Sequence, residues 1–317
     1  MKKGKKTMLG MTWMSYMGSV YGCLKQAGMW DDTLHNLIGQ TGMGFHFIIS
    51  DKLCASGPTV YNWTEEHFRM LDRVGIYSEQ EMFYKSSAAN TFKAAQKIGA
   101  QKIQASIDAG KPVIVWGPTP IPEFGIIWGY DTDDRVFFVE DCMPAEPDPL
   151  MYDNLGISDV PIFYLQFPVE KVSYDKLKTI RKSLVYAVDC WTSKVPVYPG
   201  YAIGKMAYDF LINGLQQDVI DEFGLSYSIN VYDDLKENVR KYFDDIRKMA
   251  DFDLINPIYD DYVRLTEIFH KAVQLVPFSS PGGEYNYPKE NFRELVGLMT
   301  QAKELEDRIM TAISEKL

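Results

Sequence analysis

Short blocks of hydrophobic residues alternate with polar turns between residues 107 and 142, and this pattern predicts three consecutive β-strands. The first block contains the β-branched residues Val113, Ile114 and Val115 in succession, which is typical of a strand buried on both faces. A polar turn separates the second block from the third, as in a β-hairpin. The expected strands are 111–116, 124–130 and 136–139.

Hydrophobic residues at every third or fourth position predict helices around these strands. A short helix is expected at 18–27, where Gly28 ends it, and residues 61–106 are expected to be mainly helical. Two further apolar runs, at 45–49 and 161–172, predict additional strands. Because helices with one apolar stripe cover a sheet, this part of the chain is expected to be an α+β domain.

The composition changes shortly after the last predicted strand, and from there helical periods follow one another. Apolar residues trace one face of 176–191, and Asn256 followed by Pro257 marks the start of another helix. We therefore expect two domains, a sheet-containing domain at 1–172 and an all-helical domain at 173–317.

The chain has 317 residues, of which 46% are hydrophobic, so it can form one large core or two modest ones. Its four cysteines have no CxxC spacing, which indicates reduced cytoplasmic thiols and neither a disulfide scaffold nor a zinc site. The motifs GxxxxGK[ST], GxGxxG after a strand, HExxH and GxSxG do not occur. We expect no metal and no cofactor.

A net charge of −10 argues against a nucleic-acid partner, because binding to phosphate backbones needs clustered Lys and Arg. The basic start MKKGKK is not followed by the apolar core of a secretory signal, and no run of about 18 apolar residues occurs. These features predict a cytoplasmic protein without a membrane span. Its expected partners are small molecules or peptides.

The three central strands lie in segments with recognisable sequences: SIDAGKPVIVW, EFGIIWGYD and VFFVED. Together they resemble the central sheet of papain-like cysteine enzymes of the bacteriocin-leader peptidase type. They are more closely similar to the butirosin-biosynthesis acyltransferase family, and the segment GYAIGKMAYDFL extends the resemblance into the C-terminal half. The resemblance implies a papain-like antiparallel sheet with covering helices, followed by a helical region.

The resemblance also implies an activity and a site. Family members transfer an acyl group from a carrier-protein thioester to an amine, or cleave an amide, so an acyl-carrier protein is a candidate partner. The family's histidine base corresponds to Glu123 here, and its orienting aspartate corresponds to Asp141. Alignment on Gly18 and Gly28 puts Met17 at the position of the nucleophilic cysteine, and a methionine cannot form a thiolate.

Two thiols are candidates for the missing nucleophile. Cys23 would lie more than a turn inside the first helix, where a buried, unreactive thiol is the simpler interpretation, although a shift of one helical turn would reverse this. Cys54 opens a Gly/Pro/Ser turn after a strand, and it would need Glu123 or His46 nearby to form a chemical pair. His46 lies between two phenylalanines and is either structural or catalytic.

Glu123 follows a proline-rich approach that is expected to hold it rigidly at the start of its strand. A carboxylate can serve as a general base when burial brings its pKa towards neutrality, and a facing Asp141 would favour this. Glu123 could equally be a structural hydrogen-bond acceptor. The candidate substrate-binding residues are Tyr16, Met17 and His46.

Two hypotheses from different classes follow. In the first, the chain is an acyl- or amide-processing enzyme of small-molecule or peptide metabolism that uses Cys54 or Cys23 with Glu123 and Asp141. In the second, it is an inactive papain-like protein that binds an acyl-carrier partner, a peptide or an amine-bearing metabolite. A reactive thiol near Glu123 would distinguish the two.

Overall fold

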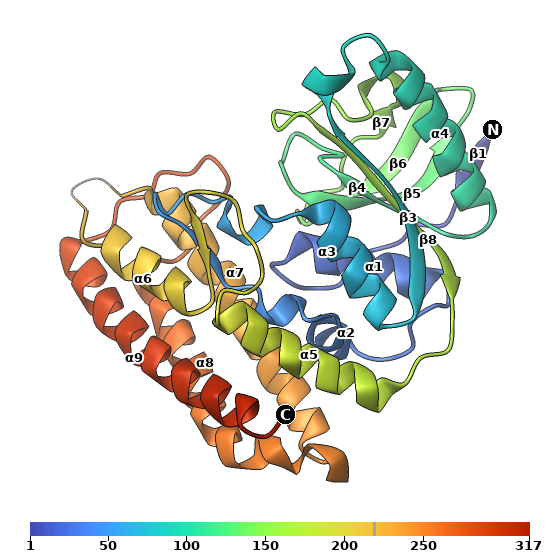
Figure 1. Ribbon diagram of the computed structural model, residues 1–317. Coiled ribbons are helices and arrows are strands. Elements are labelled where there is room, and N and C mark those ends of the chain that lie inside the picture. The colour runs from blue at the N-terminus through green and yellow to red at the C-terminus, as the bar shows by residue number, and fades with distance from the viewer. Residues whose placement is uncertain (218–219) are drawn as a thin grey trace. The chain divides into compact units, whose positions relative to one another are not determined.

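The computed structural model describes residues 1–217 and 220–317, which form helices and antiparallel strands (Figure 1). The chain divides into two compact units. Unit 1 comprises Met1–Leu34 and Trp63–Tyr174, and unit 2 comprises His35–Asn62 and Asp175–Leu317. The sequence predicted that residues 1–172 form one domain. In the structure, His35–Asn62 instead belongs to the same unit as the C-terminal helices.

Unit 1 is built on a seven-stranded sheet in which neighbouring strands are antiparallel, with the order β3-β8-β4-β5-β6-β7 and with β1 paired to β5. The mixed class of helices and antiparallel sheet that the sequence predicted is therefore confirmed. The strands are β1 (Lys2–Gly4), β3 (Ile76–Tyr84), β4 (Val113–Trp116), β5 (Phe124–Asp131), β6 (Val136–Glu140), β7 (Leu150–Met151) and β8 (Ile162–Lys171).

The strand β3 lies where the sequence predicted helix. It pairs with β8 along its whole length and forms one end of the strand order. Its centre is the polar run Ser78–Glu81, which lacks the apolar character of the buried strands. A strand at a sheet edge needs only one apolar face, and its pairing with β8 comes from a distant part of the chain. The local pattern therefore missed it.

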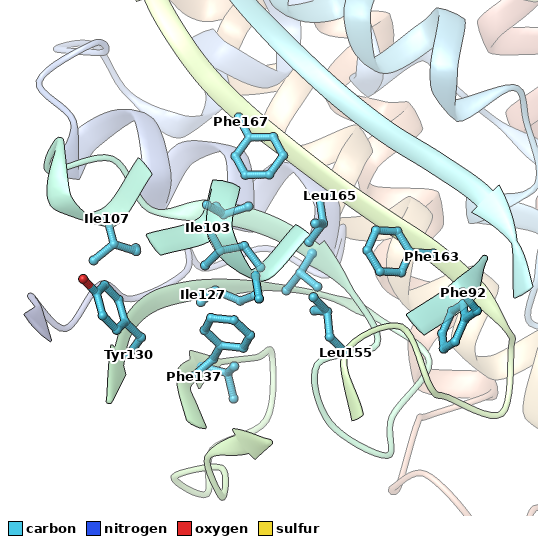
Figure 2. Packing of buried hydrophobic residues seen from close by; sticks show 14 residues of the cluster. Phe92, Ile103, Ile107, Ile127, Tyr130, Phe137, Leu155, Phe163, Leu165 and Phe167 are labelled. Carbon is cyan, nitrogen blue, oxygen red and sulfur yellow. The ribbon is translucent and has the colours of Figure 1, made fainter. Parts of the chain in front are cut away.

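One face of the sheet is covered by α4 (Phe92–Asp108). Ile103 and Ile107 of this helix join a buried cluster with Val113, Ile127 and Leu165 from three different strands (Figure 2). Side chains alternate along each strand, so the intervening residues point to the opposite face. The strands β4 and β8 thus contribute to two separate cores.

The opposite face packs against α1 (Ser15–Gln26) and α3 (Trp63–Arg73). Tyr164 and Gln166 of β8 bond here with side chains of both helices, since Tyr16 donates to Gln166 and His67 bonds with Tyr164. The helix α1 begins three residues earlier than the sequence predicted. It ends before Gly28, whose φ of +67° lies in the left-handed region that glycine tolerates.

Unit 2 is mainly helical and also contains a two-stranded sheet. The strand β2 (Ile48–Ser50) pairs antiparallel with β9 (Tyr201–Ile203). The expectation that the C-terminal region is all-helical is therefore wrong. Its helices are α2 (Leu34–Thr41), α5 (Lys176–Trp191), α6 (Lys205–Gly214), α7 (Glu222–Ile246), α8 (Asn256–Leu275) and α9 (Lys289–Ser314).

Two contacts explain why residues 35–62 belong to this unit. The first is the pairing of β2 with β9, which joins segments about 150 residues apart in the chain. The second is the close approach of α2 to α7, where a Cβ on Gly39 would lie 2.2 Å from the ring of Tyr242. Both contacts are long-range, so the local sequence pattern did not reveal them.

The core of unit 2 contains a buried ion pair between Lys236 of α7 and Glu306 of α9, whose side chains are 3% and 4% exposed. The Tyr208 hydroxyl donates to the other carboxylate oxygen of Glu306 at 2.6 Å. The ammonium group also lies over the ring of Phe47, 5.3 Å from its centroid. Every charged atom of the pair thus has compensating contacts.

We predict that Lys236→Met lowers the free energy of unfolding by about 3–5 kcal/mol, because it leaves the Glu306 carboxylate buried without its cation. The double variant Lys236→Met/Glu306→Leu should recover most of this loss, since it removes both charges. Urea denaturation followed by circular dichroism measures both effects. A single variant as stable as the wild type would show that the pair does not contribute as described.

Candidate functional site

The candidate site of unit 1 centres on a hydrogen bond between Ser15 and Glu123. Ser15 is the first residue of α1, and Glu123 immediately precedes β5. The Ser15 hydroxyl donates to Glu123 Oε2 across 2.5 Å, and Ser15 Oγ accepts the Phe124 N–H at 3.1 Å. The shorter distance is that of a charge-assisted O–H···O⁻ bond. The carboxylate therefore polarises the serine hydroxyl.

The loop between β4 and β5 holds Glu123 in place. The Gly117 N–H donates to the Glu123 carbonyl at 2.9 Å and closes the proline-rich loop on itself. Gly117 has a φ of +57°, which an L-residue with a side chain rarely adopts. The three prolines between these residues restrict the remaining backbone angles. These features restrict the backbone of the loop that leads to Glu123 at the strand start.

The N-terminus of α1 adds a positive potential at Ser15. The first N–H groups of a helix have no partner within the helix, and its dipole places partial positive charge there. In the part of the chain that the structure describes, the preceding Met14 provides no side-chain cap. Negative charge that develops close to Ser15 Oγ is therefore stabilised by α1.

Asp141 follows β6 directly and is 8% exposed. The Thr119 hydroxyl donates to its Oδ2 at 2.8 Å, and the Met143 N–H donates to its Oδ1 at 2.8 Å. Both carboxylate oxygens are thus engaged by groups on flanking loops. Asp141 is held in one orientation by these bonds.

The pKa of the Cys142 thiol is affected by the negative charges of this region. Partial removal from water raises the pKa of its thiol, and the negative charges of Glu123 and Asp141 raise it further. Both carboxylates therefore contribute to the electrostatic environment of the same sulfur atom. Although the residue is exposed, its thiol is poorly nucleophilic at neutral pH.

Three candidates from the sequence lie within α1, and their side chains are completely buried: Tyr16, Met17 and Cys23. Tyr16 and Met17 directly follow Ser15, but neither exposes surface that a substrate could contact. Burial also raises the pKa of the Cys23 thiol, so this sulfur is both covered and neutral. These positions do not support substrate binding by Tyr16 and Met17 or nucleophilic attack by Cys23.

Cys54 belongs to unit 2, whereas Glu123 and Asp141 belong to unit 1. Its sulfur lies 2.8 Å from Ser56 Oγ, which in turn lies 2.8 Å from the Tyr201 hydroxyl. Partial burial acts to raise the pKa of the thiol, but hydrogen bonds from Ser50 and Ser56 outweigh this and lower it. The pKa of the Cys54 thiol is therefore lowered, whereas the pKa values of Cys23 and Cys142 are raised, and the contacts named here include no carboxylate or histidine.

His46 also belongs to unit 2 and is buried. It does not lie within a strand, as the sequence suggested, but between a 3₁₀ turn (Met43–Phe45) and β2. Its Nε2 is 2.5 Å from the Tyr186 hydroxyl, and its ring meets Tyr61 edge-on. These contacts are those of a packed core histidine.

Sequence reasoning missed two residues here: Ser15, which is part of the pair with Glu123, and His67, which packs beside it. Ser15 was overlooked because the helix start was predicted at Gly18, although serine is common where helices begin. His67 was not among the candidates, yet it is completely buried, stacks on Tyr16 with ring centroids 3.5 Å apart and bonds with Tyr164 at 2.7 Å. Its spacing from Trp63 and from the later apolar residues of α3 was the available signal.

No protein-family model matches the chain, and no curated protein matches it significantly. Within residues 1–217 and 220–317, no group of three or more His, Cys, Asp or Glu side chains is arranged to hold a metal ion. None of the helices in those ranges has both the length and the apolar character needed to cross a bilayer.

We predict that iodoacetamide at about pH 6 modifies Cys54 before the other cysteines. An ordinary thiol is under about 1% thiolate at this pH, and a lowered pKa increases that fraction. Cys142 should react slowly despite its exposure, because its pKa is raised. Peptide mass mapping at substoichiometric reagent measures the order of reaction.

The matched control is Ser56→Ala, which removes a hydrogen bond to the Cys54 sulfur and should slow its labelling. Faster modification of Cys142 than of Cys54 would contradict the assigned electrostatics.

Proposed function

We propose that the chain catalyses acyl transfer or amide hydrolysis with Ser15 as the nucleophile and Glu123 as its general base. The observation that carries this proposal is the 2.5 Å hydrogen bond from the serine hydroxyl to the carboxylate at the N-terminus of α1. A nucleophile within hydrogen-bond reach of a base is the basic arrangement of covalent catalysis.

The proposed reaction has two steps. In the first, Ser15 Oγ attacks the substrate carbonyl carbon while its proton passes to Glu123, and the tetrahedral oxyanion is stabilised at the N-terminus of α1. The bond to the leaving group then breaks, and Glu123 returns the proton to that group. In the second step, Glu123 takes a proton from water or an amine as this attacks the Ser15 ester. The ester bond then breaks, Glu123 returns the proton to Ser15 Oγ, and the acyl group leaves on the new acceptor.

The order of elements supports the proposal. Ser15 begins a helix, Glu123 precedes a central strand, and Asp141 follows the next strand. In the papain-like family that the sequence resembles, the nucleophile, the base and the orienting residue come from this succession of elements. Under the proposal, serine replaces cysteine and glutamate replaces histidine, with Ser15 rather than Met17 at the nucleophile position.

The substrate class follows from the same comparison. A carrier-protein thioester is the acyl donor in the resembled family, and an amide-containing small molecule or peptide is the alternative donor. A site with two carboxylates near each other favours an acceptor that carries an amine, because a cation offsets their charge.

The second candidate function is that of a papain-like binding protein without catalysis. Ser15 is only 3% exposed, and its Oγ also accepts the Phe124 N–H. These features favour a hydrogen bond that ties α1 to β5. A test of chemical reactivity at Ser15 decides between the two functions.

We predict that a fluorophosphonate probe labels Ser15 in the native chain and that Glu123→Gln slows labelling by about 100-fold or more, because the base is lost. Peptide mass mapping locates the label, and Ser15→Ala should abolish it.

The matched control is Ser19→Ala, the same change one turn further along α1. Ser19 is fully buried, and its hydroxyl has no hydrogen-bond partner among the described residues, so this variant should keep both fold and labelling. If native Ser15 is never labelled while Ser15→Ala and Glu123→Gln only lower the unfolding temperature, the binding function is correct.

A further inference from the structure

We propose that unit 1 carries a second site, which binds a small phosphate ester in a cavity beside α4. The cavity has a volume of about 320 Å³, within the range of small-ligand sites. Its wall is formed by α4, by the turn that precedes β6 and by the 3₁₀ turn η4 (Tyr152–Asn154). The described contacts of Ser15 and Glu123 do not involve these elements.

Three cations line the cavity, whereas the chain as a whole carries a net charge of −10. Lys93 and Lys97 lie one turn apart on α4, both exposed, and in the described part of the chain neither forms an ion pair. Arg135 is the third cation, and Asp153 faces it at 3.6 Å as the cavity's carboxylate. The excess of two positive charges matches a phosphate monoester, which carries nearly two negative charges at neutral pH.

Arg135 adopts an unfavourable backbone conformation at this cavity. Its φ of +56° lies in the left-handed region, where a residue with a long side chain is uncommon. The guanidinium also lies over the ring of Tyr152, 5.6 Å from its centroid. Glycine or asparagine would fit this turn better, so the backbone conformation does not explain the arginine, whose charge lines the cavity.

Gln96 contributes a buried acceptor to the same wall. The residue is 4% exposed, and its Nε2 donates to the carbonyls of Asp153 and Leu155 at 2.8 and 2.9 Å. These two bonds fix the orientation of the amide and join α4 to η4. Its Oε1 has no hydrogen-bond partner among the described residues. Such an oxygen is normally satisfied, so we infer that the ligand supplies an N–H or O–H donor.

The cavity is separate from the candidate catalytic site. It lies with α4, which covers one face of the sheet, whereas Ser15 belongs to α1 on the other face. The ring of Tyr152 packs against Phe137 of β6, 4.3 Å between centroids. The proposal therefore stands independently of catalysis at Ser15.

The test is isothermal titration of the full chain with two matched probes at low salt. O-Phosphoethanolamine and phosphocholine have the same phosphate group and the same net charge, but only the first has N–H donors. We expect saturable binding of O-phosphoethanolamine at one site per chain and at least about tenfold weaker binding of phosphocholine. Equal affinity for both probes would overturn the role of Gln96.

The variant Lys97→Gln should weaken binding of O-phosphoethanolamine by about tenfold or more. The matched control is Lys102→Gln on the same helix, because Lys102 pairs with Glu81 and does not line the cavity. The proposal would be overturned if binding to the native chain did not saturate. It would also be overturned if both variants lost the same affinity for O-phosphoethanolamine, because this would show only a general attraction of anions.

The variant Arg135→Gly distinguishes an effect on ligand affinity from an effect on the stability of the fold. Glycine relieves the left-handed backbone, so the variant should unfold at the same or a higher temperature while losing affinity for O-phosphoethanolamine. A variant that unfolds earlier and still binds would show that Arg135 supports the fold instead.

Discussion

The pairing of β5 with β4 on one side and with β6 on the other is the constraint on which unit 1 depends. The antiparallel register brings the start of β5 next to the end of β4 and the end of β6. Glu123 and Asp141 occupy these positions, so two residues 18 apart in the sequence act on the same neighbouring thiol. The alternation of side chains then directs Val113 and Val115 to α4, while Tyr164 and Gln166 meet α1 and α3.

The electrostatic character of unit 1 differs between the two sites that we propose. The Ser15 site contains two carboxylates and lies at the N-terminal end of α1, where the helix dipole places partial positive charge. The cavity beside α4 is rich in cations. A net charge of −10 gives no indication of this separation, because it averages over the whole chain.

The parts of the fold that the sequence predicted are those with local signals. The strands β4, β5 and β6 were found within about two residues because each is apolar and bounded by turns. The strand β3 and the placement of His35–Asn62 in unit 2 were not found, because each depends on pairing with a distant segment. Glu123 and Asp141 were named in advance on the strength of a resemblance, whereas Ser15 was missed by an error of three residues at a helix start. Helix boundaries are the least reliable part of such predictions, and here the boundary decides which residue is proposed as the nucleophile.

The central claim is that Ser15 forms an acyl-enzyme, and the most direct measurement is mass spectrometry of the chain quenched in acid after incubation with an activated acyl thioester. Our account predicts one acyl group on the peptide that contains Ser15. This adduct should resist neutral hydroxylamine, because an oxygen ester reacts with it far more slowly than a thioester. An acyl group on Cys54, released by hydroxylamine, would contradict the assignment of the nucleophile. No adduct on any residue would contradict catalysis and favour the binding function.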